Sequence, residues 1–179
     1  MIKLHMKTGV EQSVYAVLLL NMLPDRAVLP GEAISRQLGV SPTYFQKLLR
    51  KLVSAGLITS VAGVKGGFKL QKKPEDICVF DIYQAIEGQQ SLYSPSGVLG
   101  DLLALEKQER CCLLSGLMED AESAWKAVMQ KETIAGLSAK MNEEQFREKT
   151  AALQNWLEEE IDRMNDKEKL QPVGDPAGQ

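Results

Sequence analysis

The sequence predicts a mainly α-helical chain with one small β-hairpin, arranged as a winged helix-turn-helix domain followed by a C-terminal helical dimerisation region. Two observations predict this class. Over most of the chain, apolar residues recur at steps of three and four, which is the period of a helical face. The period changes over residues 57–70, where two short β-prone runs flank a glycine-rich turn. Two helices joined by a tight turn and followed by a hairpin are typical of a winged helix-turn-helix.

The first three helices are bounded by residues that start or stop helices. The first is predicted over residues 9–23. The second opens at Pro30, which suits a first helical turn because the amide hydrogen it lacks has no partner there. It closes at Gly39, and glycine is favoured just past a helix C-terminus. The third begins at Ser41-Pro42, an N-cap followed by proline, and ends at Gly56.

The second half of the chain is predicted to be helical. A helix over residues 79–87 ends at Gly88. The later helices are expected at 98–109, 114–130, 132–140 and 142–166, the last with Asn142 and Gln145 as a capping box. The predicted organisation is a winged helix-turn-helix domain over 1–88, a helical dimerisation and regulatory region over 98–167, and a disordered tail over 168–179.

Charge is distributed unevenly along the chain. Residues 1–75 carry 11 Lys and Arg against 4 Asp and Glu, a net charge of +7, whereas residues 76–179 carry 10 against 20, a net charge of −10. A basic surface attracts a polyanion such as DNA, because each neutralised phosphate releases counterions. We therefore expect the N-terminal half to face double-stranded DNA and the acidic half to lie away from it.

The sequence contains no recognisable targeting, membrane or catalytic segment. Its most apolar stretch, from Val14 to Met22, is shorter than the ~20 residues that span a bilayer, and it lacks the basic flank of a signal peptide. We expect a cytoplasmic protein with no membrane partner. No phosphate-binding loop, nucleophile–base pairing or metal-ligand spacing is present, which predicts that the protein is not an enzyme and needs no cofactor or metal.

The third predicted helix is the candidate for reading DNA. A major groove admits one helix, whose N-terminal residues meet the base edges. We expect base contacts from Thr43, Tyr44, Gln46 and Lys47, and phosphate contacts from Arg50 and Lys51. The alternative is a packed helix whose charged face is simply solvated. The preceding helix, the Gly39 turn and the hairpin favour the reading of DNA.

The tip of the hairpin is a second candidate DNA contact. Lys65 lies in the turn, and Gly66 and Gly67 beside it let the backbone approach DNA closely. A basic tip of this kind enters the minor groove or touches phosphate. The alternative is an ordinary exposed turn.

One face of the helix at 114–130 predicts a homodimer. It carries the apolar residues Leu117, Ala121, Ala124 and Val128, with Trp125 beside them. A small domain leaves such a stripe uncovered, and a second copy of the same helix is the simplest cover. Two reading heads related by one two-fold axis require a pseudo-palindromic DNA site.

Three cysteines, Cys78, Cys111 and Cys112, are too few for a disulfide framework. The adjacent pair Cys111-Cys112 could sense redox state if a helix N-terminus lowered the pKa of a thiol. Two buried small hydrophobes are the alternative that we favour.

Several motifs occur together and in order along the chain. They are Tyr15-Ala16-Val17, the run 33–52, Gly56-Leu57-Ile58, Gly63-x-x-Gly66-Gly67-Phe68, Ile77-x-Val79-x-Asp81-Ile82, Ala85-Ile86-Glu87-Gly88, Cys112-Leu113-Leu114 and Thr133-Ile134-Ala135-Gly136-Leu137. In combination they resemble the Rrf-two family of bacterial winged-helix regulators, which includes the iron–sulfur, nitric-oxide and cysteine-metabolism repressors. The resemblance covers residues 8–137 and implies a homodimeric transcriptional regulator that represses from a pseudo-palindromic operator.

The chain departs from the cluster-binding members of that family. Those relatives hold iron with three spaced cysteines before the dimerisation helix, whereas here only Cys112 falls at such a position, and no cysteine lies between Glu87 and Arg110. The resemblance therefore implies a regulator without the cluster, whose signal is a small molecule, a protein effector or thiol oxidation. The rival function is a protein-interaction module that keeps the winged fold without binding DNA.

Overall fold

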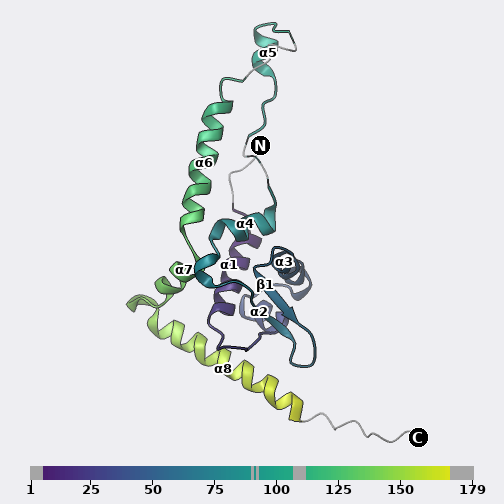
Figure 1. The fold of residues 1–179 in the computed structure, drawn as a ribbon, viewed down its shortest axis with the longest axis vertical. Helices are drawn as coiled ribbons and strands as arrows, with labels where there is room; N and C mark the ends of the chain where they lie inside the picture. Colours follow the sequence, from purple (N-terminus) through teal and green to yellow (C-terminus); the bar gives the residue numbers. More distant parts are fainter. Residues whose placement is uncertain (1–5, 90, 92, 107–111, 170–179) are drawn as a thin grey trace, which may run out of the picture.

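The computed structural model describes residues 6–89, 91, 93–106 and 112–169. Most of these residues are helical, and among them there is one two-stranded antiparallel sheet (Figure 1). In chain order the elements are α1 (Thr8–Asn21), α2 (Gly31–Gln37), α3 (Pro42–Ser54), β1 (Ile58–Val61), β2 (Gly67–Leu70), η1 (Pro74–Asp76), α4 (Val79–Glu87), α5 (Val98–Leu102), α6 (Ser115–Lys131), α7 (Ile134–Met141), η2 (Glu144–Phe146) and α8 (Arg147–Lys169). The predicted fold class is confirmed.

Helix α1 forms the centre of the reading head, the unit formed by α1 to α4 and the hairpin. It is buried along most of its length because α3, α4, α7 and β2 all pack against it. α3 contributes the largest buried side chain, Phe45, which is fully enclosed, together with the buried Leu49 and Leu52. These residues recur at steps of three and four, so they line one face of α3 and leave its other face outside the core.

The hairpin pairs Ile58 with Leu70 and Val61 with Gly67. A third segment joins it, because the backbone of Leu29 exchanges two hydrogen bonds with Phe68, at 3.0 and 2.9 Å. The wing is therefore tied to the loop before α2. This tie fixes the hairpin relative to the helix-turn-helix and satisfies backbone groups of β2 that its outer edge would otherwise expose.

Helix α6 extends away from the reading head as an arm, with α5 near its far end (Figure 1). At its base it packs on α4, where the ring of Trp125 meets Tyr83 edge-on, with the ring centroids 4.8 Å apart. Beyond that contact the arm leaves apolar side chains in solvent: Val98, Leu102, Leu103, Leu113, Leu114, Leu117 and Val128 are each more than half exposed.

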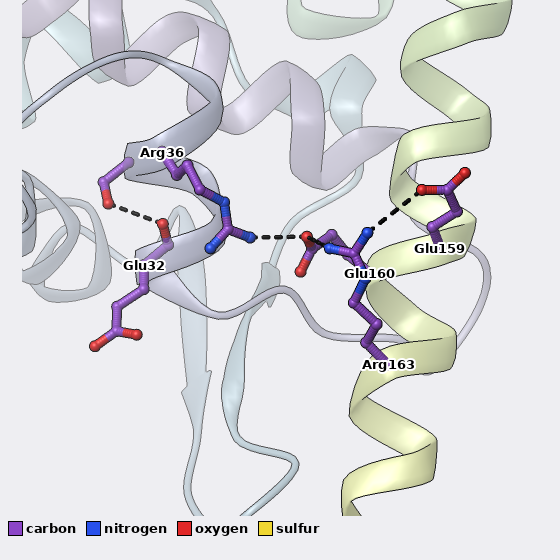
Figure 2. A network of polar contacts seen from close by, with 6 residues as sticks. Glu32, Arg36, Glu159, Glu160 and Arg163 are labelled. Atoms are coloured by element: carbon purple, nitrogen blue, oxygen red, sulfur yellow. Dashed lines mark hydrogen bonds and ion pairs between the residues drawn. The ribbon is translucent and has the colours of Figure 1, made fainter.

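Helix α7 lies at the base of the arm, and α8 continues from it along the end of the reading head that faces away from the arm (Figure 1). Ile134 and Leu157 are buried in the same core cluster as α1. Glu160 of α8 is also buried, and it accepts a 2.7 Å hydrogen bond from Arg36 of α2 and a 2.6 Å bond from Arg163 (Figure 2). This shared carboxylate attaches the last helix to the first helix of the helix-turn-helix.

Most predicted elements agree with the structure to within two residues, and the exceptions are the last helix and the helix predicted at 98–109. The last helix begins at Arg147 rather than at Asn142, because Asn142 ends α7 and its side chain donates to Ser138 O at 3.1 Å. The predicted helix at 98–109 is described as helical only over α5. In the described part of the chain, no helix is long and apolar enough to cross a membrane.

Candidate nucleic-acid interface

The face of α3 opposite the core presents the predicted DNA-reading side chains. Thr43, Gln46, Lys47 and Arg50 are all exposed, and together with the first turn of α2 they line one shallow hollow. The N-terminal turn of α3 carries no carboxylate. The structure therefore brings four of the six predicted α3 residues together on one polar, basic surface, which we call the α3 face.

The other two predicted residues of α3 lie elsewhere. The Nζ atom of Lys51 donates a 2.5 Å hydrogen bond to the carbonyl oxygen of Ile86, at the end of α4. The hydroxyl of Tyr44 lies over the first turn of α1, 2.8 Å from where a Cβ on Gly9 would be. Both side chains contact a neighbouring helix, and both are exposed, so their predicted DNA contacts stay predictions.

Packing of the hairpin explains why residues 66 and 67 are glycines, which the sequence alone did not show. A Cβ on Gly66 would lie 2.6 Å from Val61 O, and one on Gly67 would lie 2.7 Å from Leu29 O. Real Cβ atoms do not approach backbone oxygens so closely. Gly66 and Gly67 are thus required by the packing of the hairpin, whatever they contribute to DNA binding.

Lys65 lies beside α8. It lines a hollow with Arg26 and Lys69 on the reading-head side and with Ile161 and Met164 on the α8 side. Arg26 and Lys69 were not among the predicted DNA contacts. The net positive charge of residues 1–75 predicted a basic surface without saying which cations form it. The tertiary structure places Arg26 and Lys69 in the same hollow as Lys65.

The predicted dimerisation residues divide into two groups. Leu117, Ala121, Ala124 and Val128 form one exposed face of α6, which we call the α6 face. Trp125 instead packs on Phe80 and Tyr83 of its own chain. Its ring anchors the arm to α4, and its predicted part in a dimer stays a prediction.

Cys78 and Cys112 lie in different surroundings. Burial is the main cause that raises the pKa of the Cys78 thiol, and its hydrogen bond with the Asp81 side chain is the second cause. The backbone N–H of Cys78 donates to the Asp81 carboxylate at 2.9 Å, which caps the start of α4. The pKa of Cys112 is lowered, first by the Tyr93 hydroxyl 3.1 Å from its Sγ and then by the backbone N–H of Leu114. Cys111, the other predicted redox residue, lies outside the described residues.

The two described cysteines lie near opposite ends of α6. Cys78 forms a β-bridge with Thr133, just past the C-terminal end of α6, whereas Cys112 precedes its N-terminal end. A helix rises 1.5 Å per residue, so α6 is about 25 Å long and the two cysteines lie near its opposite ends. An iron–sulfur cluster needs its thiolates around one small group of atoms. Within the described residues, no three His, Cys, Asp or Glu side chains gather as metal ligands.

A tight α2–α3 pair, a polar exposed face on α3 and a tied hairpin define a winged helix-turn-helix protein. Residues 6–140 match the Rrf2 family model, described as an iron-dependent transcriptional regulator. The chain belongs to the Rrf2 family of bacterial transcriptional regulators, as the sequence motifs predicted. The family consists of regulators rather than enzymes, and DNA binding is implied by its helix-turn-helix.

Three similar proteins illustrate the match. YwgB of Bacillus subtilis, whose name describes an HTH-type transcriptional regulator, is 42% identical over 140 residues, which cover 78% of this chain and 88% of YwgB. YffB of Lactococcus lactis, named in the same way, is 32% identical and covers 87% of this chain and 99% of its own. The structure of IscR from T. potens aligns with a TM-score of 0.56 at 25% identity, covering 79% of this chain and 90% of IscR.

Proposed function

We propose that the protein is a dimeric repressor that binds a pseudo-palindromic operator, with the α3 face in the major groove and the wing on the flanking backbone. The observation that carries this proposal is the α3 face itself, where two cations and two hydrogen-bonding side chains are exposed at the end of the helix that would enter the groove. Gln and Lys side chains recognise purine edges there, and Arg50, further along the helix, reaches phosphate.

Two substitutions separate base reading from backbone contact. Gln46→Ala is expected to cost ~1–3 kcal/mol on the operator and to relax the preference at one base pair, because a base-edge contact is lost. Arg50→Ala should weaken all DNA sequences alike and reduce the salt slope by about one, because one phosphate contact is lost. The operator is first selected from a random duplex library, and both variants are then titrated by fluorescence anisotropy at several salt concentrations.

The same titrations decide between DNA binding and the rival function. Lys72→Ala, which removes an exposed cation outside the α3 face, is the control for a general loss of positive charge. Equal losses on operator and random DNA for Gln46→Ala would contradict base reading. A protein that selects no sequence from the library would instead favour a protein-interaction module.

The arm supports the dimeric part of the proposal. The α6 face and the described residues at the arm's far end expose many apolar side chains, with Leu102 77% and Leu113 80% accessible. A monomer seldom leaves an apolar surface of that extent in water. The same helix of a second copy covers it with a self-complementary interface, and the pairing would hold two α3 faces in fixed register.

We further propose that this member of the family does not hold an iron–sulfur cluster. The separation of Cys78 from Cys112 along α6 and the raised pKa of Cys78 support this. Purified without oxygen, the full chain should be colourless and hold no stoichiometric iron. Visible absorption spectroscopy and iron analysis measure this. A brown preparation that oxidants bleach would contradict the proposal.

A further inference from the structure

A groove of about 680 Å³ opens where α1, α7 and the start of α8 meet. Small-molecule sites in proteins occupy ~300–1,000 Å³ and are mostly apolar with a few polar groups. The apolar lining includes Val14, Leu18, Leu137, Met141 and Leu153. None of these residues belongs to the α3 face, the wing or the arm, so the groove is separate from the DNA and dimer surfaces proposed above.

The mouth of the groove exposes apolar side chains to solvent. Tyr15 is 50% accessible and Phe146 is 48% accessible, and both line the groove. The two residues come from α1 and η2, which lie far apart in sequence. Large exposed apolar side chains that gather around a hollow indicate a binding site more often than an ordinary surface does.

Two lysines line the groove, one from α7 and one from α8. Lys140 lies in the last turn of α7, and Lys149 lies in the first turn of α8. The residues that follow them are joined, because the Thr150 hydroxyl donates to Met141 O at 2.6 Å. Lys140 pairs with Glu132, whereas Lys149 has no ion-pair partner in the part of the chain that the structure describes. The carboxylate in the lining, Glu11, lies on α1.

We propose that this groove binds a small amphipathic organic anion, with its apolar body against α1 and α8 and its carboxylate at Lys149. The lining suits that chemistry: an apolar surface favours an aliphatic or aromatic body, and an ammonium group that pairs with no described carboxylate favours an acidic head group. The α7–α8 end carries the positive charge, so the carboxylate lies away from Glu11.

This site would regulate the proposed DNA binding, and to that extent it rests on the proposed function. Val14 and Leu18 of the groove wall belong to the core on which α3 packs. α8, which forms the opposite wall, is attached through Glu160 to Arg36 of α2 (Figure 2). A ligand that ties α8 to α1 therefore acts on the two helices that hold the helix-turn-helix in place.

The test uses decanoate as the probe, at concentrations below micelle formation, and the full chain without DNA. Isothermal titration calorimetry should show saturable binding at about one site per protomer. Lys149→Glu should weaken decanoate binding by about tenfold or more, because it replaces an attractive charge with a repulsive one. Lys72→Glu makes the same change of charge at an exposed position outside the groove and should leave binding unchanged. Decanol, which lacks the charge, should bind both variants equally.

A second variant tests the apolar wall. Phe146→Ser removes a half-exposed ring, so the fold should persist by circular dichroism while the affinities for decanoate and decanol both fall. Three results would overturn the proposal: no saturable binding of decanoate, equal binding by the wild type and Lys149→Glu, or binding that disappears as the protein dimerises. The last result would assign the groove to a second copy of the chain. Operator binding is measured separately and without decanoate, so a protein that binds decanoate but selects no operator contradicts only the proposed function.

Discussion

Ala121→Glu is expected to abolish the dimer and, with it, tight operator binding. Ala121 lies at the middle of the exposed α6 face, between Leu117 and Val128. In a two-fold dimer the substitution places two carboxylates in one apolar seam, and burying a charge without a partner costs several kcal/mol. Since ~1.4 kcal/mol is a factor of ten in affinity, operator binding should fall by about 100-fold or more. Sedimentation velocity measures the oligomer, and anisotropy measures the DNA affinity.

The control for this change is Ser123→Glu, on the same helix. Ser123 is exposed, and two helical steps of 100° turn it well away from Ala121. It introduces the same charge outside the proposed seam, so the dimer and the operator affinity should be retained. The winged domain should stay folded in both variants, because neither residue belongs to its core. A wild type that sediments as a monomer, or an Ala121→Glu variant that remains a dimer with unchanged affinity, would show that the architecture is wrong.

Gly67→Ala is expected to lower the free energy of unfolding by about 1–3 kcal/mol. The added methyl group would meet the backbone carbonyl of Leu29 at 2.7 Å, and backbone atoms in a hydrogen-bonded pair cannot move aside as a side chain can. The tie between Leu29 and Phe68 should loosen, and the wing should lose its fixed position. Urea denaturation followed by circular dichroism measures the change in stability.

Gly116→Ala is the matched control for this substitution. Gly116 lies in α6 with nothing within 4 Å of its added Cβ, and alanine favours a helix by about 0.5–1 kcal/mol over glycine. It should leave the free energy of unfolding unchanged or raise it slightly. If Gly67→Ala instead keeps full stability and weakens only DNA binding, the glycine serves the DNA contact that the sequence suggested rather than the packing.

Local sequence signals determined most of the elements of this protein. The steps of three and four along α3 predicted both its buried row, centred on Phe45, and the polar face opposite, because a helix turns every 3.6 residues whatever surrounds it. The hairpin was also predicted locally, because a glycine-rich turn lies between two short β-prone runs. The family motifs lie on these same helices and turns, so the family could also be predicted from the sequence.

What the tertiary structure decided was how side chains that are distant in sequence meet. Lys51 and Arg50 are neighbours, look alike in the sequence and are both exposed, yet Lys51 donates to the last turn of α4 whereas Arg50 lines the hollow of the α3 face. Trp125 lies beside the α6 face, yet its ring packs on Tyr83 of α4. The groove at Lys149 forms because the start of α8 lies close to α1, although the two helices are far apart in sequence. Periodicity reports which face of a helix is apolar, but the partner of that face is set by long-range packing, which no local pattern encodes.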